Sequence, residues 1–182
     1  MIKISNPAAM ALNAYDVPPP WYRMTNTRQV AKDVAPRDLL NNVASVLKDL
    51  KAKFGTPGTL IINCHGGSSP PKLGIGTGIT KPDVVHFQKI APYVSDIIII
   101  ACNAARANAN QKFDGMDLMS LIAKTANASV TAATEIQWPE TGPVADPNWL
   151  PVGYIDDWEG PVMYFNNKGD VKDIQVNGKT LL

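Results

Sequence analysis

Apolar positions define one helix most clearly, over residues 36–54. Apolar side chains recur there at steps of three and four residues, which places them on one helix face: Leu39, Leu40, Val43, Val46, Leu47, Leu50 and Phe54. Pro36 suits the first helical turn, and Gly55 suits the left-handed position that ends a helix. The pattern therefore predicts an amphipathic helix between these two residues.

Three short apolar runs favour buried strands. They lie at 59–64, 96–102 and 129–138, and they lack the polar alternation of a strand with one wet face. Helical segments are expected between them, at about 82–94 and about 116–126. This alternation of helices and apolar strands predicts a three-layer α/β/α sandwich with a mostly parallel sheet.

Irregular segments complete the single domain that we expect. Residues 1–27 contain three consecutive prolines and show neither the two-residue period of a strand nor the 3.6-residue period of a helix. They are expected to form an N-terminal arm over an α/β core at 28–138. The Gly- and Pro-rich stretch 66–81 is expected to be a mobile loop. Residues 139–182 begin as a loop and continue with the turn signals NNKGD and NG, which predict a β-hairpin that adds an antiparallel edge.

Composition and charge exclude several classes of function. Hydrophobic residues make up 45% of the 182 residues and charged residues 18%, within the range of globular domains. The formal net charge is +1, which gives no long-range attraction to nucleic acid or to an anionic membrane. No apolar run approaches the roughly 18 residues of a membrane span, and no signal-peptide core is visible. We expect a soluble protein, either cytoplasmic or delivered by a route that needs no signal peptide.

His65 and Cys102 are the candidates for chemistry, because each ends an apolar strand run. Ligands collect at the carboxyl ends of parallel strands, and neighbouring strands lie about 5 Å apart. An imidazole at that distance can take the proton of a thiol or stabilise the thiolate. Gly66 directly follows the histidine, where it allows close approach of a substrate and offers an N–H group to an oxyanion.

The blocks LIINCHG at 60–66 and IIIIAC at 97–102 resemble the caspase-like (clan CD) cysteine peptidases, in a divergent bacterial form. The resemblance implies a caspase-like fold, with His65 as general acid and base, Cys102 as nucleophile, and the N–H groups of Gly66 and Cys102 as oxyanion hole. It also implies a substrate pocket formed partly by the strand after the nucleophile and the loop beyond it, at Ala133, Glu135 and Trp138. The sequence differs from caspases after the nucleophile, where Asn-Ala-Ala follows.

The function expected from these residues is a cysteine endopeptidase that acts on a peptide or protein substrate. It needs no cofactor and no metal, and neither nucleic acid nor a membrane is expected as a partner; no oligomeric state is predicted. The alternative is a catalytically inactive caspase-like module that binds a protein partner through the Pro- and Trp-rich segments 17–22 and 138–161.

Each candidate residue also has a purely structural interpretation. Cys102 could be a buried core thiol, and His65 could cap its strand. Cys64 precedes the histidine, so strand alternation turns it to the opposite face and into the core. His86 lies within a helical segment, which argues against a metal cluster with Cys64, His65 and Cys102. The segment GIGTG at 74–78 lacks the ending of a phosphate-binding loop.

Overall fold

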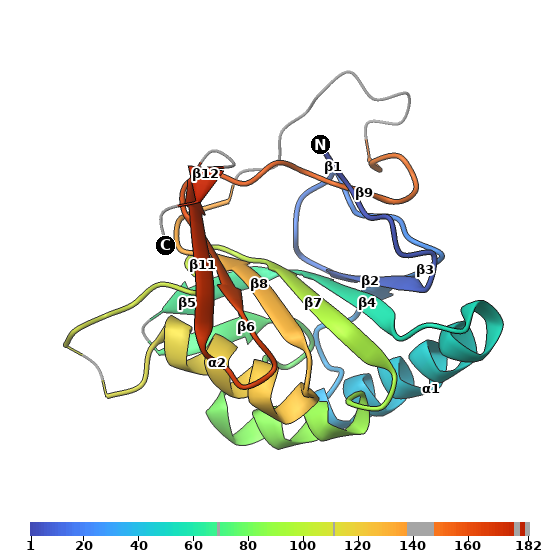
Figure 1. Cartoon of the computed structure of the whole chain (residues 1–182), viewed down its shortest axis with the longest axis horizontal. Coiled ribbons are helices and arrows are strands. Elements are labelled where there is room, and N and C mark those ends of the chain that lie inside the picture. Colours follow the sequence, from blue (N-terminus) through green and yellow to red (C-terminus); the bar gives the residue numbers. More distant parts are fainter. Residues whose placement is uncertain (69, 111, 138–147, 177–178, 181–182) are drawn as a thin grey trace.

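A mixed β-sheet organises the chain (Figure 1). The computed structural model describes all residues except 69, 111, 138–147, 177–178 and 181–182. The strand order across the sheet is β12 (Lys179–Thr180), β11 (Val171–Val176), β10 (Val162–Phe165), β8 (Ser129–Ala133), β7 (Val94–Ile100), β4 (Gly58–Asn63), β2 (Ala9–Ala14) and β3 (Asn26–Val30).

The sheet has a parallel part and an antiparallel part. Strands β3, β2, β4, β7 and β8 are parallel to one another, whereas β10, β11 and β12 join the edge at β8 in antiparallel pairs. The predicted antiparallel hairpin is confirmed by β10 and β11. The expectation of a mostly parallel sheet is wrong, because this C-terminal extension contributes nearly half of the strand pairs.

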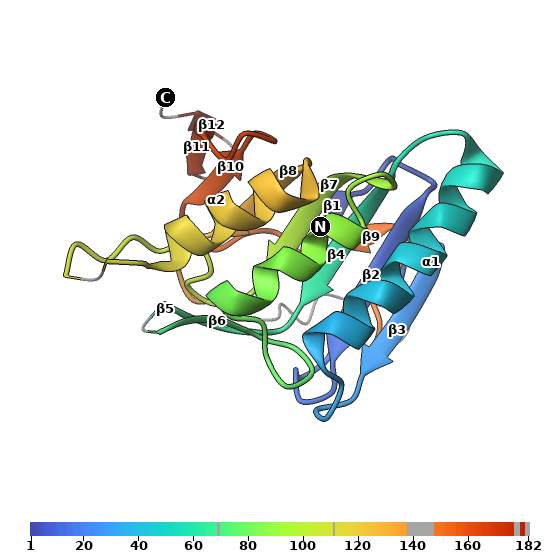
Figure 2. The same cartoon turned by 90° about the horizontal axis from the view of Figure 1, so that it is seen from below.

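All described helices pack on one face of the sheet (Figure 2). They are α1 (Pro36–Phe54), the 3-10 helix η1 (Lys81–Lys89) and α2 (Gly115–Ala126), and η1 contacts both others. The helix over 36–54 is confirmed, with Pro36 in its first turn and Gly55 in the left-handed region at φ 76°. None of these helices has the length and apolar character of a membrane span.

The opposite face carries no helix within the described residues, so the expected three-layer sandwich is not confirmed. Crossovers between parallel strands are right-handed, so the direction of each step across the sheet decides which face its connection covers. The steps from β3 to β4, β7 and β8 all run in one direction and carry the helices. Only the step from β2 to β3 runs the other way, and residues 15–25 make it without a helix. This segment covers the second face together with the small sheet of β1 (Ile2–Lys3) and β9 (Tyr154–Ile155).

Two segments expected to be irregular are regular. Strand β2 lies within the expected N-terminal arm, yet it is buried throughout and pairs with both β3 and β4. The sequence AMALNA does not indicate a strand, because its alanines and its asparagine give neither strand propensity nor alternation. The expected mobile loop at 66–81 begins as a hairpin of β5 (His65–Ser68) and β6 (Pro71–Gly74), and three of its side chains are fully buried: Leu73, Ile75 and Ile79.

Candidate active site

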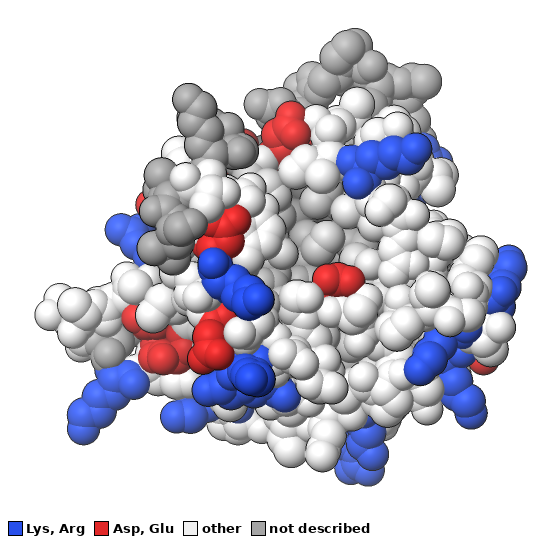
Figure 3. Space-filling model, viewed as in Figure 1, with Lys and Arg blue, Asp and Glu red and all other residues white. Residues whose placement is uncertain are grey.

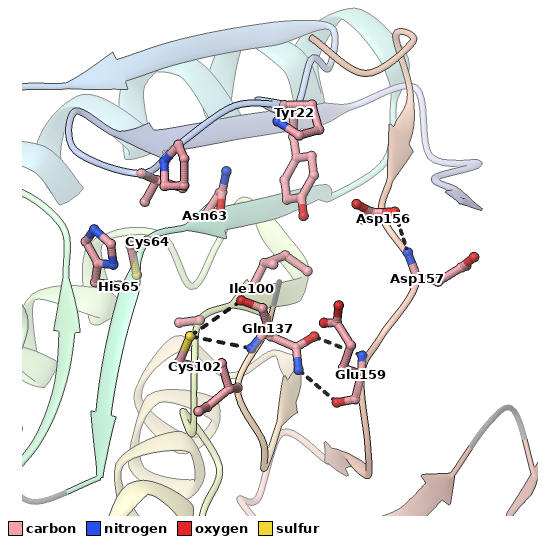
Figure 4. Close-up of a pocket in the computed structure, with 15 residues that line it drawn as sticks. Tyr22, Asn63, Cys64, His65, Ile100, Cys102, Gln137, Asp156, Asp157 and Glu159 are labelled. Atoms are coloured by element: carbon pink, nitrogen blue, oxygen red, sulfur yellow. Dashed lines mark hydrogen bonds between the residues drawn. The ribbon is translucent and has the colours of Figure 1, made fainter. Parts of the chain in front are cut away.

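A pocket of about 230 Å³ lies at the carboxyl ends of β4 and β7 (Figure 4). Strands β2 and β4 start crossovers that run in opposite directions, and open α/β sheets bind ligands at such switch points. The pocket is lined by strand ends, by the segment after β2, by the loop after β8 and by the segment after β9: Val17, Pro18, Pro20, Tyr22, Asn63, Cys64, His65, Ile100, Ala101, Cys102, Ile136, Gln137, Asp156, Asp157 and Glu159.

His65 and Cys102 both border this pocket, at the ends of neighbouring strands. Strands β4 and β7 are parallel, with Asn63 opposite Ile100 and with the Cys64 N–H donating to the Ile100 carbonyl at 3.0 Å. Each candidate residue lies two positions beyond this matched pair. The topology therefore brings together the two residues that end the two apolar runs.

The two thiols differ in environment. Cys64 is 5% exposed and belongs to the core on the helix side, as strand alternation predicts. Burial raises the pKa of the Cys64 thiol to about 12, so this group stays protonated at neutral pH. Cys102 is only half-buried. Cys102 is therefore the thiol that a reagent or substrate can reach.

A tight turn presents Cys102 at the end of β7. The N–H of Ala104 donates to the carbonyl of Ala101 at 3.3 Å, and Asn103 adopts the left-handed region at φ 54°. Asparagine tolerates this conformation better than most residues with a side chain. The turn therefore projects Cys102 from the sheet edge instead of continuing the strand.

The thiol of Cys102 is hydrogen-bonded to the backbone of Gln137. Its Sγ accepts from the Gln137 N–H at 3.4 Å and donates to the Gln137 carbonyl at 3.6 Å. The side chain of Gln137 in turn donates to the Glu159 carbonyl at 2.8 Å and accepts from the Glu159 N–H at 3.3 Å. Gln137 thus connects the thiol to the chain segment that follows β9 (Figure 4).

The imidazole of His65 contacts Asp16 and lies apart from the thiol of Cys102 (Figure 4). Its Nε2 lies 3.2 Å from the backbone carbonyl oxygen of Asp16 and 3.8 Å from the carboxylate Oδ1. A carbonyl oxygen only accepts, so the hydrogen bond requires the proton on Nε2. In the neutral imidazole, Nδ1 is then the unprotonated nitrogen and can act as a base.

Gly66 lies directly against the backbone of Cys102. A Cβ atom added at Gly66 would overlap the carbonyl oxygen of Cys102 and would also crowd its backbone nitrogen, at 3.0 Å. Only glycine fits between the two strand ends. This close approach places the backbone of Gly66 beside the thiol-bearing residue.

A buried asparagine network fixes the upper wall of the pocket. Asn13 on β2 donates through Nδ2 to the Tyr22 carbonyl at 3.0 Å, and its Oδ1 accepts from the Tyr22 N–H at 3.0 Å. The Asn63 side chain on β4 also donates to that oxygen, at 3.0 Å. Tyr22 is held in this way over the strand ends, and its ring projects into the pocket (Figure 4).

Two of the three residues expected to form the substrate pocket lie elsewhere. Ala133 is fully buried in β8 opposite Val162, and Glu135 is exposed; neither lines the pocket. Trp138 lies outside the described residues. The reason is the hairpin of β10 and β11, which pairs with β8 and fixes Ala133 inside the sheet. The loop contributes its next residues, Ile136 and Gln137, instead.

Sequence reasoning missed the walls from the two ends of the chain, namely Tyr22, Asp156 and Glu159. Acidic residues ordinarily lie in solvated turns, yet Asp156 is only 6% exposed. The sequence signal for this wall is the pair of aromatic residues in YIDDWE, because aromatic side chains anchor a segment to the core.

Two tryptophans join the segments that cover the helix-free face. The rings of Trp21 and Trp149 meet edge to face with their centroids 5.1 Å apart, and Arg23 lies 5.6 Å from the centre of the Trp149 ring. Their backbones also form a β-bridge. These contacts give both tryptophans a packing role in this structure.

Acidic and basic side chains are interspersed on the described part of the face in Figure 3. Within the described residues, no group of three or more His, Cys, Asp or Glu side chains is placed to hold a metal ion.

Comparisons with protein-family models, with curated proteins and with solved structures give no match for this chain.

Proposed function

We propose that the protein is a cysteine endopeptidase with Cys102 as nucleophile and His65 as general acid and base. The observation that carries this proposal is the in-register pairing of β4 and β7, which sets both residues at the rim of one pocket. The same order of a strand ending in His-Gly and a strand ending in Ala-Cys carried the resemblance to caspase-like peptidases.

The reaction follows from the chemistry of these groups. Nδ1 of His65 takes the thiol proton, and Sγ of Cys102 forms a bond to the carbonyl carbon of the substrate. The developing oxyanion accepts hydrogen bonds from the N–H groups of Gly66 and Cys102. The protonated His65 gives its proton to the leaving nitrogen as the C–N bond breaks. Water, deprotonated by His65, then attacks the thioester, releases the carboxylic acid and restores the thiol.

Two contacts have to change before this reaction can begin. The thiol has to leave the backbone of Gln137, and the imidazole of His65 has to turn or shift toward Cys102 while its Nε2 stays near Asp16. Catalytic hydrogen bonds are often long or absent without substrate and form in the complex. A peptide that pairs with the strand ends can exchange its own backbone groups for those of Gln137.

The test is cleavage of a mixed peptide library by the wild type and by Cys102→Ala and His65→Ala. Either substitution should reduce turnover by about 1,000-fold or more, because each removes a group that takes part in bond making. Cys64→Ala and His86→Ala are the matched controls and should keep most of the activity. An electrophilic thiol probe should label the wild type and Cys64→Ala but not Cys102→Ala. Wild-type turnover no higher than that of Cys102→Ala would contradict the proposal.

The inactive binding module remains the second candidate, because one observation favours it. Both hydrogen bonds of the Cys102 thiol are satisfied by Gln137, as in a structural thiol that never reacts. In that case Cys102→Ala should leave a small void and lower the free energy of unfolding by about 1 kcal/mol. Absence of turnover together with this loss would select the binding module.

A further inference from the structure

The pocket beside Cys102 has walls of one charge sign. Its described lining includes the carboxylates of Asp156, Asp157 and Glu159 and no Lys or Arg. We propose that this pocket binds the side chain of a Lys or Arg residue on the N-terminal side of the scissile bond, with Asp156 as the main determinant of this preference. The inference rests on the proposed peptidase function and names its substrate class.

Asp156 is expected to attract a cation more strongly than the other carboxylates, because it is buried. Only 6% of the residue is exposed, and its Oδ1 accepts a hydrogen bond from the Asp157 N–H at 3.0 Å. A carboxylate in a partly dehydrated pocket attracts a cation more strongly than one in water. Asp157 is exposed and already pairs with the α-ammonium group of Met1 at 2.7 Å, so it contributes less.

The field of these carboxylates reaches the interior of the pocket. The pKa of the Tyr22 hydroxyl is raised, first by burial, then by the negative charge of Asp156 and more weakly by that of Glu159. Tyr22 forms the wall opposite Gln137 and Glu159 (Figure 4). A cationic group that enters between these walls would meet the same negative potential.

The remaining walls suit a side chain that has a long aliphatic part and a charged end. Val17, Pro20 and Ile100 line the pocket together with the ring of Tyr22. Lys and Arg bury an aliphatic stem along such surfaces while the charged tip reaches a polar group. An acidic side chain would meet like charge, and an apolar one would gain no electrostatic attraction from the carboxylates.

Ligand binding to the Cys102→Ala variant, which should not cleave peptides, tests this inference separately from the peptidase proposal. Nα-acetyl-arginine methylamide and its neutral citrulline counterpart would be titrated into Cys102→Ala and followed by NMR. The two ligands have nearly the same shape, so charge is the main difference. The arginine ligand should bind at least about tenfold more tightly, because its guanidinium group gains the carboxylate partners.

Removing the charge should remove the preference. In the Cys102→Ala background, Asp156→Asn keeps an oxygen for the Asp157 N–H and should bring the two affinities within about twofold of each other. Glu159→Gln should have a smaller effect in the same direction. Asp49→Asn, an equal charge change on the exposed side of α1, is the matched control and should leave the preference unchanged.

The outcomes distinguish the two proposals. Equal affinity for arginine and citrulline, or a preference that survives both Asp156→Asn and Glu159→Gln, overturns the inference. Wild-type cleavage that favours Leu or Asp before the scissile bond also overturns it but leaves the peptidase standing. Arginine binding without turnover of any peptide overturns the peptidase and leaves a site for basic ligands.

Discussion

The two faces of the sheet are built by different means. The helix side holds a large apolar core whose biggest fully buried side chains include Phe87, Leu40 and Leu47. The other side has a much smaller apolar cluster, and the sheet presents the buried polar residues Asn13 and Asn63 on this side. The candidate active site opens on this second side.

The difference indicates a division of labour within one sheet. Apolar burial is non-directional and gives stability in proportion to area, which favours the helix side. A hydrogen-bonded network gives less free energy but fixes position, which is what the wall of a binding pocket requires. We therefore expect substitutions on the helix side to change stability and substitutions on the other side to change ligand binding and cleavage.

The largest change in stability is expected for Phe87→Ala on η1. Phe87 is fully buried, so removal of its ring should lower the free energy of unfolding by about 3–5 kcal/mol, measured by urea denaturation. Val85→Ala on the same helix is the control, because Val85 is 59% exposed and should change stability by about 0.5 kcal/mol or less. Similar losses in the two variants would remove the basis for assigning stability to this face.

An intermediate effect is expected for Asn13→Ala. The substitution leaves the backbone N–H and carbonyl of Tyr22 without their partner, which should cost about 1–3 kcal/mol. Limited proteolysis should also cut residues 15–25 more readily, and the arginine ligand should bind more weakly because Tyr22 loses its anchor. Asn41→Ala on the exposed side of α1 is the control. Unchanged proteolysis and ligand binding in Asn13→Ala would show that the network does not hold the wall.

The smallest effect concerns Cys64 and pH. Burial raises the pKa of its thiol from 9.0 to about 12, so the folded protein keeps a proton that the unfolded chain loses. Below about pH 9 the Cys64 thiol does not lower the free energy of unfolding, and as the pH rises toward 12 it lowers this free energy progressively. Between about pH 8.5 and about pH 10, ionisation of this thiol in the unfolded chain should lower the free energy of unfolding of the wild type by about 1 kcal/mol. Cys64→Ala should show a fall in stability that is smaller by that amount, whereas an identical pH dependence would contradict the burial of this thiol.

Local patterns predicted the helix side well and the helix-free side poorly. The periodicity over 36–54 and the run at 59–64 specify α1 and β4, because a repeating apolar face is a property of neighbouring residues. Strand β2 depends instead on pairing with β3 and β4, and its alanines leave no such pattern. The direction of each crossover is likewise a property of the whole sheet.

The candidate site divides in the same way. The positions of His65 and Cys102 could be predicted because each residue follows a recognisable strand. The pocket walls could not, because Tyr22 and Asp156 come from segments more than 130 residues apart that meet only in the folded chain. Ala133 and Glu135 were expected in the pocket because of the resemblance to caspase-like peptidases, whereas the pairing of β8 with β10 buries Ala133 within the sheet.

If Cys102 is the nucleophile that we propose, its hydrogen bonds to Gln137 make this part of the chain a competitor of the substrate. In the proposed peptidase, a peptide would replace the Gln137 backbone beside the thiol only in the fraction of molecules in which Gln137 has moved away, so the apparent dissociation constant would equal the intrinsic one divided by that fraction. Because Gln137 is also bonded to Glu159, a ligand that draws the segment after β9 toward itself changes this fraction. For such a ligand, occupancy of the acidic pocket and exposure of the proposed nucleophile would be thermodynamically linked, and either one would alter the free energy of the other by the same amount.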